Sequence, residues 1–457
     1  MTNRINKTYV LTAAQALNST DPNKGAPNKS LMKGVERYVK DHDAELIILT
    51  MRGQTAREID LHPYFQTRDD IYWPEERNIK LNNNIMVSDM VVPPQNVDPT
   101  TGRKRFPQRE QSMVIGHTKQ RFLTIPTSNY KLPKILASTG AITHPNYSEA
   151  NHRGDVAGRD HIYGMLVVEI IDNTHYNIRN IRAQKDGKFI DLGMKYNQGR
   201  KPTKANVEAL VLGDLHIGDH DEKAMKASYE MIDHLNPKRL FLHDVANMHS
   251  VNPHERGQLI RGIIESKKGR RSLEEELKLD HKHLCKLAKA MGKREVNIVF
   301  SNHDDFLYRY LNDSMFLKDS YENCALGLKL IQHAVEGENP LEAGVKMMGD
   351  VPSNIRFLKL DDDYKSWGWQ LASHGHKGNS GARGSTVGKE LAHGKSITGH
   401  SHSPEILRNT IVVGSNTIQS DYTKGGGSSW MPANAVLYEG GLVQLLPIID
   451  GKWMMKR

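Results

Sequence analysis

Cysteines and long apolar runs are scarce in this sequence, and their scarcity excludes several classes of protein. Cys285 and Cys324 are the two cysteines among 457 residues, so neither a disulfide framework nor a Cys-x-x-Cys metal site is available, and we expect both thiols to be reduced and structural. No stretch approaches the roughly 20 apolar residues that cross a bilayer. The first residues also lack the apolar core of a signal peptide. We therefore expect a cytoplasmic protein that is not inserted in a membrane.

Acidic residues are outnumbered only in the first part of the chain. Residues 1–205 hold 30 Lys and Arg against 21 Asp and Glu, whereas residues 206–457 hold 32 of each, so the first part carries the whole net charge of +9. A hydrophobic content of 38% with 25% charged residues is typical of a globular chain. The length favours two domains, each with its own core.

The first 205 residues open with a strand–helix–strand pattern. Apolar runs at residues 9–12 and 46–50 predict strands, and helical spacing at residues 31–39 predicts a helix between them. Proline, asparagine and basic residues at 93–109 predict an exposed loop that carries Arg103, Lys104, Arg105 and Arg109. We predict a separate basic α/β (α+β) N-terminal domain, residues 1–205, ending in a polar linker at residues 196–204.

In residues 206–457, three predicted strands are each followed at once by side chains of the kinds that bind metals. These side chains are Asp214 and His216 after residues 208–212, Asp244 after residues 239–242, and Asn302 with His303 and Asp304 after residues 296–300. Helices are predicted between them, at residues 222–235 and, after a Ser272 cap, up to Met291. Open α/β sheets present their ligand sites at the carboxyl ends of strands. The pattern therefore favours one shared site.

Histidines follow two later predicted strands in the same way. His374 and His376 come after residues 369–372, and His400 and His402 come after residues 396–398. In a chain with 22 histidines a single His-x-His pair is a weak signal, because most histidines bind nothing. Five groups that each follow a strand favour joint metal binding. Asp, Asn and His suit Mn, Fe and Zn, and two such ions can clamp the attacking and departing oxygens of a phosphate ester.

The five groups also form a recognisable series. In order they are GDLH at 213–216, HD at 243–244, SNHD at 301–304, SHGH at 373–376 and GHSH at 399–402. This series resembles the calcineurin-like metallophosphoesterases, whose pattern is DxH, GD, GNH(D/E), His and GHxH. The resemblance covers most of residues 208–420. It implies a catalytic domain at residues 206–457 with a four-layer α/β/β/α sandwich, preceded by the basic domain.

The resemblance implies two divalent metal ions that share one carboxylate. One ion would be held by Asp214, His216, Asp244 and His402, and the other by Asp244, Asn302, His374 and His400. A hydroxide between the ions would be the nucleophile. His303 would stabilise the charge that develops on the phosphate or protonate the leaving oxygen, with Asp304 as its orienting partner. Mn is the expected metal, and Fe or Zn stays open.

Two positions depart from the family pattern. His243 and Ser301 stand where the family has glycine, which predicts a different loop geometry at both places. The seven ligands themselves are all present, which favours catalysis over an inert metal site. The first histidine after the strand is the usual ligand of the family, so His374 is preferred to His376. His376 is then expected to support a ligand or to face the substrate.

Several polar residues are candidates for substrate contacts, each with a purely structural alternative. Asn247 and His249 follow the shared aspartate and either contact substrate or cap a helix. A Gly/Ser-rich loop after residue 376 can hold a phosphate backbone through its amides and cations, or be a solvated loop. The basic loop at 103–105 can neutralise phosphates, or be a solvated face. The candidates are His376, Asn247, His249, Lys377, Arg383, Arg103, Lys104 and Arg105.

The leading hypothesis is a metal-dependent DNA nuclease whose basic domain positions the polyanion, similar in kind to SbcD-type repair nucleases and phage-encoded relatives, in which case it would act in the host cytoplasm. A protein or small-molecule phosphatase is the alternative, although HDVANMH at 243–249 lacks the Arg-Gly that protein phosphatases carry there. A third reading is a catalytically inert nucleic-acid-binding protein with a structural metal. DNA against RNA, endonuclease against exonuclease, and monomer against homodimer stay open.

Overall fold

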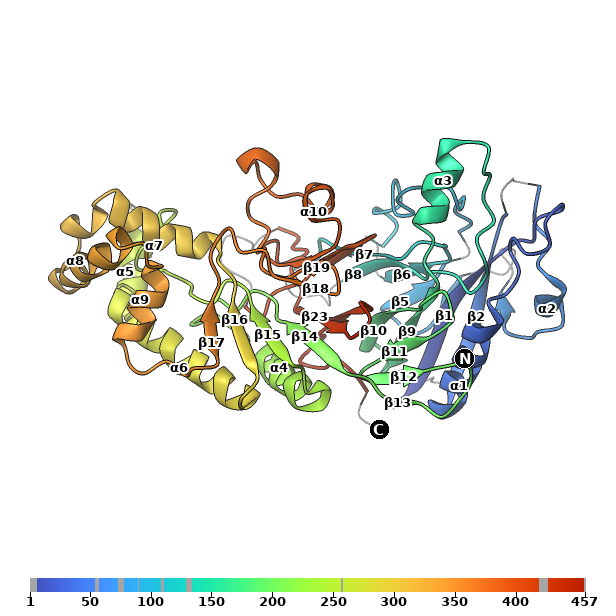
Figure 1. The fold of residues 1–457 in the computed structure, drawn as a ribbon, viewed down its shortest axis with the longest axis horizontal. Coiled ribbons are helices and arrows are strands. Elements are labelled where there is room, and N and C mark those ends of the chain that lie inside the picture. The colour runs from blue at the N-terminus through green and yellow to red at the C-terminus, as the bar shows by residue number, and fades with distance from the viewer. Residues whose placement is uncertain are drawn as a thin grey trace.

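The structure is a computed structural model, and it describes residues 6–53, 57–72, 78–88, 90–107, 111–128, 134–255, 258–418 and 426–455. Within these residues the chain forms several sheets and ten α-helices, so the expected α/β class is confirmed. In Figure 1 the helices α5 to α9 gather at one end of the molecule, and the N-terminal strands with α1 form the other end. The two larger sheets lie between these ends.

The predicted strand–helix–strand opening is confirmed in a five-stranded sheet of order β10-β9-β1-β2-β3. The side chain of Asn28 caps the helix that joins β1 to β2, and Leu31, Val35 and Tyr38 of that helix are buried on the sheet. The elements are β1 (Lys7–Gln15), α1 (Lys29–Asp41), β2 (Ala44–Met51), α2 (Pro63–Gln66), β3 (Ile71–Tyr72), α3 (His152–Arg159), β9 (Gly164–Ile170) and β10 (Tyr176–Arg182).

A ten-stranded sheet contains strands from both sides of residue 205, in the order β18-β19-β20-β22-β21-β7-β8-β6-β5-β4. Its strands are β4 (Ile79–Lys80), β5 (Ile85–Val87), β6 (Ser112–Ile115), β7 (Arg121–Ile125), β8 (Lys134–Ser138), β18 (Lys365–Ser366), β19 (Trp369–Gln370), β20 (Ser396–Thr398), β21 (Glu405–Leu407) and β22 (Thr410–Val412). The joint is the antiparallel pair β7 and β21, in which Phe122 lies opposite Ile406. The division near residue 205 stays a prediction, but the two parts are joined by a shared sheet as well as by the chain.

The predicted linker and the predicted basic loop differ in structure. The linker ends in β13 (Thr203–Lys204), which pairs with β12 (Met194–Tyr196) and, through it, with β11 (Phe189–Asp191) in a small sheet. The basic loop contains turns but neither helix nor strand at residues 93–107, as predicted, and its last two residues lie outside the described part.

The six-stranded sheet supplies the strand ends on which the candidate site is built. Its order is β17-β16-β15-β14-β23-β24, with β14 to β17 parallel. Leu210 and Leu212 pack on one face against helices, whereas Ala209 and Val211 pack on the other face against the ten-stranded sheet. Alternating apolar positions are thus buried on both faces. The strands are β14 (Val207–Val211), β15 (Arg239–Leu242), β16 (Glu295–Ile298), β17 (Ile355–Phe357), β23 (Ala433–Tyr438) and β24 (Val443–Pro447).

The helices predicted from capping signals begin and end where the sequence places them. The Ser272 side chain accepts a hydrogen bond from the Glu275 amide, and Gly292 ends the helix with a positive φ of 63°. None of the helices in the described residues combines the length and apolar composition that a membrane span requires. The helices of this part are α4 (Glu222–Leu235), α5 (Leu259–Lys267), α6 (Leu273–Met291), α7 (Asn302–Asn312), α8 (Tyr321–Val335), α9 (Pro340–Met347) and α10 (Thr386–His393).

Candidate metal centre

The seven predicted ligands lie together at the carboxyl edge of the parallel strands. Asp214 and His216 follow β14, Asp244 follows β15, and Asn302 begins α7 after β16. His374, His400 and His402 follow β19 and β20, strands of the neighbouring sheet. We call these seven residues the metal cluster.

One half of the metal cluster consists of Asp214, His216, Asp244 and His402, all of them buried. The Nε2 atoms of His216 and His402 face each other at 3.0 Å. His402 Nε2 lies 3.1 Å from Asp214 Oδ2, and His216 Nε2 lies 3.6 Å from Asp244 Oδ2. Four donor atoms therefore converge on one point, as the ligands of a single cation do.

The other half uses the same oxygen of Asp244. His374 Nε2 lies 3.2 Å from Asp244 Oδ2 and 3.1 Å from Asn302 Oδ1. His400 Nδ1 lies 3.0 Å from Asn302 Oδ1. Because Asp244 Oδ2 is the atom common to both halves, the geometry suits two cations that share one carboxylate.

Several buried polar atoms of the metal cluster have no hydrogen-bond partner among the described residues. They include Asp214 Oδ1, Asp244 Oδ1 and the Nδ1 atoms of His216 and His402. A buried polar atom without a partner costs free energy, and a divalent cation would relieve that cost for the two carboxylates. The donor set therefore fits divalent transition metals. Neither the number nor the identity of the metal follows from it.

Two histidines and the shared carboxylate of the cluster have pKa shifts that favour the forms that bind metals, whereas the carboxylate of Asp244 raises the pKa of His374 against the effect of burial. Burial lowers the pKa of His216 to about 3 and that of His400 to about 4, which keeps both imidazoles neutral. Burial opposes ionisation of Asp244, but the neighbouring histidines, His374 foremost, hold the pKa of its carboxyl well below its usual range. Neutral imidazoles and ionised carboxylates are the forms that bind cations.

The backbone is strained at four residues of the metal cluster. His216, Asp244, His400 and His402 have φ values of 43°, 43°, 80° and 56°, a region that residues other than glycine rarely adopt. Such conformations persist only where the surroundings impose them, and they gather at functional sites. Gly399 has a different reason to be glycine, because a Cβ there would lie 2.3 Å from Asp214 Oδ1.

His243, one of the two departures from the family pattern, lies directly behind the cluster. It is fully buried, and its Nδ1 lies 3.3 Å from the Nδ1 of His374. His374 thus points Nε2 at Asp244 and turns its other nitrogen to His243. A partner for the second nitrogen fixes the orientation of a ligand histidine.

His303 lies beside the cluster, but Asp304 does not orient it as expected. His303 Nδ1 donates a hydrogen bond to the carbonyl oxygen of Asn247 at 2.8 Å, which leaves Nε2 for a substrate. The Asp304 carboxylate instead accepts from the amide and hydroxyl of Ser301 and caps α7. This also accounts for Ser301, the second departure, because the pair forms a capping box.

A pocket opens above the metal cluster, and several predicted contacts line it. Asn247 and His249 are among its lining residues, together with His216, Asp244 and His402 of the metal cluster. His249 lies 2.8 Å from Asp219 and 3.0 Å from Glu255, while Arg270 pairs with Asp219 and Arg261 pairs with Glu255. We call these five residues, Asp219, His249, Glu255, Arg261 and Arg270, the rim cluster.

The remaining candidates lie farther from the centre. His376 lies 3.5 Å from Asp305 and Lys377 lies 3.2 Å from the same carboxylate, whereas Arg383 is exposed; none of the three is among the described residues that line the pocket. In the basic loop Arg103 donates to the carbonyls of Pro99 and Thr101. Arg105 lies over Phe106. Lys104 is exposed and lines a second groove, described below.

Sequence reasoning missed part of the pocket wall. Phe306, Ile418 and Trp430 line the pocket but belong to no motif. Asp219 is the second acidic residue of the GDLHIGD stretch at 213–219. Its place in this motif was a usable signal, but the sequence analysis gives it no role. Trp430 gave no signal beyond the rarity of tryptophan in this chain.

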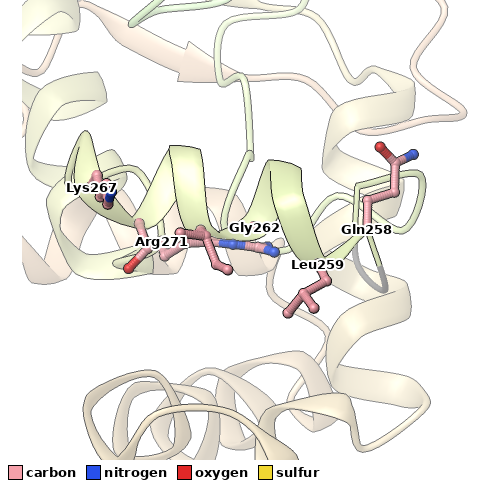
Figure 2. A pocket seen from close by; sticks show the side chains of 7 residues that line it. Gln258, Leu259, Gly262, Lys267 and Arg271 are labelled. Atoms are coloured by element: carbon pink, nitrogen blue, oxygen red, sulfur yellow. The ribbon is translucent and has the colours of Figure 1, made fainter.

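A separate hollow lies along α5. Figure 2 shows Gln258 and Leu259 at the start of this helix and Lys267 and Arg271 towards its other end. Gln258 borders both this hollow and the pocket above the metal cluster. Among its described lining residues this hollow has no group of metal-binding side chains, in contrast to the pocket above the metal cluster.

Comparison with known proteins gives one informative similarity. No family model and no solved structure matches the chain. Protein A1 of Escherichia phage T5 is 26% identical over an alignment of 474 positions, which covers 98% of this chain and 83% of that protein. The similarity spans both the basic part and the metal cluster, and the relative is a phage protein whose name states no activity.

Proposed function

We propose that this chain is a phosphoesterase that uses two divalent metal ions, with Mn²⁺ the first candidate, and that it hydrolyses the phosphodiester backbone of DNA. The observation that carries the proposal is the shared oxygen of Asp244, which lies 3.2 Å from His374 Nε2 and 3.6 Å from His216 Nε2. A carboxylate between two groups of ligands is the arrangement that metal-pair hydrolases use on phosphate esters.

The proposed chemistry divides between the metals and the chain. When bound, a metal pair lowers the pKa of water and neutralises charge on the phosphate. His303 is the one polar side chain beside the cluster that we assign to the substrate. Its Nε2, in the protonated form that a phosphate favours, would donate to a phosphate oxygen or give a proton to the leaving oxygen. The Asn247 carbonyl holds the ring in place for this task.

The wider fold agrees with the proposal. The six-stranded and ten-stranded sheets share a core, α4 and α6 belong to the helical core on the other face of the first sheet, and α10 contacts β20 and β22 of the second. This packing supports the four-layer sandwich. The positive charge of residues 1–205 supports a polyanionic substrate such as DNA.

The test is a hydrolysis assay with circular and linear DNA, RNA, a chromogenic phosphodiester and a chromogenic phosphomonoester, with Mn²⁺ and with a chelator. We expect cleavage of DNA and of the diester with Mn²⁺ and none with the chelator. Cleavage of the chromogenic diester but of neither DNA nor RNA would contradict the nuclease assignment. Cleavage of the monoester alone would favour a phosphatase. No turnover with Mn²⁺, Fe²⁺ or Zn²⁺ would favour the inert binder.

A further inference from the structure

Aromatic side chains stand directly next to the metal cluster. The ring centroid of Trp430 lies 4.1 Å from that of the ligand His402, and the two rings are inclined by 66°. Trp430 is partly exposed and lines the pocket above the metals, with Ile418 and Phe306 also in the wall. A phosphate group needs cations and hydrogen-bond donors, so an indole at this place suits a flat apolar group attached to the phosphate.

A second groove is lined by the chain neighbours of His402 and Trp430. It is lined by Ser403, which follows the ligand His402, and by Ser429, which precedes Trp430. The hydroxyls of Ser403 and Ser429 are hydrogen-bonded at 2.7 Å, and we call this pair the Ser403–Ser429 ridge. The groove and the metal pocket are therefore lined by adjacent residues of the same two segments, His402 with Ser403 and Ser429 with Trp430.

The groove is also lined by residues of the basic N-terminal part. Thr124 of β7 donates to the Ser429 carbonyl at 2.7 Å, which ties this part to the ridge. Lys104 and Arg121 line the groove. Arg121 is buried and paired with Glu405 and Asp98, whereas Lys104 is exposed, so Lys104 is the cation best placed to meet a phosphate.

We propose that the pocket and the groove form one track for single-stranded nucleic acid, in which a base next to the scissile phosphate stacks on Trp430 and the backbone crosses the Ser403–Ser429 ridge towards Lys104. A base can stack on a side chain only after it has left the duplex stack, so the substrate is a single strand or a frayed end. The inference rests on the proposed function and adds the form of the substrate to it.

The test compares two ligands that carry the same phosphates, an oligodeoxynucleotide and a fully abasic oligomer of equal length. Binding is measured by fluorescence anisotropy in Ca²⁺, and cleavage is measured in Mn²⁺. We expect the protein without substitutions to bind the base-bearing strand about 5- to 150-fold more tightly than the abasic oligomer, which is the contribution of one stacked base. Trp430→Ala should remove that preference without weakening binding of the abasic oligomer, and Trp430→Phe should keep most of it. Trp367→Ala, which removes a half-exposed tryptophan elsewhere, is the matched control.

Lys104 is tested through salt dependence. Lys104→Ala should lower the slope of the logarithm of affinity against the logarithm of salt concentration by about 0.7, and should weaken both oligomers equally. Lys318→Ala, an exposed lysine of the 3-10 helix η1 (Met315–Lys318), is the control and should leave the slope unchanged.

The outcomes separate this inference from the proposed function. If Trp430→Ala weakens the binding of both oligomers equally and also weakens Mn²⁺ binding, the indole only supports His402. This result would contradict the proposed track. An unchanged preference in Trp430→Ala, or tighter binding of blunt duplex than of single strands, would also overturn it. If the chromogenic diester is not hydrolysed, the proposed function fails, while the anisotropy arm still decides whether Trp430 binds a base.

Discussion

The metal cluster and the rim cluster border the same pocket but are built in opposite ways. In the metal cluster, buried oxygens of Asp214 and Asp244 have no hydrogen-bond partner among the described residues. In the rim cluster, His249 lies between two carboxylates, and each carboxylate has an arginine of its own. The carboxylates of the metal cluster are therefore electrostatically incomplete without a cation, whereas both carboxylates of the rim cluster are paired, although the buried Nε of Arg261 has no hydrogen-bond partner among the described residues. This difference in the pairing of buried carboxylates distinguishes a candidate cation site from a cluster that stabilises the fold.

The largest expected effect comes from the atom that the two halves of the metal cluster share. Asp244→Asn should lower turnover of the chromogenic diester by at least about three orders of magnitude, because a neutral amide cannot hold two cations whose joint role is to lower the pKa of water by several units. The fold should persist, since an amide keeps the volume of the carboxyl group. Steady-state kinetics with Mn²⁺ and circular dichroism measure both. Unchanged turnover in a folded variant would contradict the role of Asp244 as the carboxylate shared by two cations.

His303 should give the next largest effect and should separate substrate chemistry from metal binding. His303→Ala should lower the turnover number about 10²- to 10⁴-fold, the usual contribution of a positioned proton donor. Mn²⁺ binding should persist, because His303 lies outside both groups of ligands. Turnover and calorimetric metal titration are the two measurements. Loss of both metals in this variant would contradict the assigned role.

The metal cluster was predictable from the sequence because each of its side chains lies a few residues after the end of a strand. Asp214, Asp244 and Asn302 each follow the end of a parallel strand by a few residues, and such ends meet at one edge of a sheet. Short spacing in the sequence thus becomes proximity in space. The same locality predicted α1, α4 and α6, whose apolar spacing and caps are read over single turns.

Other features depend on contacts between distant segments and gave no signal. The pairing of β7 with β21 brings Arg121 to the carbonyl of Ile406, across 285 residues, and strands of three to five residues carry too little periodicity to predict. The rim cluster has the same origin, since Asp219 meets Arg270 across 51 residues. The role of Asp304 was predictable locally, because Ser301 and Asp304 have the spacing of a capping box.

A smaller effect is expected at His243, which supports the metal cluster from behind. His243→Gly restores the glycine of the resembling family and removes the partner of His374 Nδ1, 3.3 Å away. Mn²⁺ affinity should fall about 10- to 100-fold, as for other residues that orient ligand histidines. Isothermal titration calorimetry measures the affinity, and His243→Asn, which keeps a polar group near that nitrogen, should recover part of it. Equal affinities in the three proteins would show that the metal cluster orients its own ligands.

The smallest expected effect tests the charge pairing of the rim cluster. Burial alone would lower the pKa of His249, but its hydrogen bonds to Asp219 and Glu255 raise that pKa to about 10. Protonated His249 therefore stabilises the folded state fully below its ordinary pKa of about 6.5, and this contribution is lost as the pH rises through about 10. His249→Gln cannot titrate. The melting temperature of the metal-free protein should thus exceed that of His249→Gln most at pH 6, and the gap should narrow towards pH 10.

Two comparisons make the measurement specific to the rim cluster. His152→Gln replaces an exposed histidine at the start of α3 and should show no such narrowing, which controls for the general effect of alkaline pH. Added Mn²⁺ should raise the melting temperature of His249→Gln and of the unchanged protein alike, because metal stabilises only the folded state and the metal cluster is intact in both. A gap that stays constant from pH 6 to pH 10 would mean that His249 is neutral between its carboxylates. The rim carboxylates would then face a neutral imidazole, and His249 would become a candidate for proton transfer.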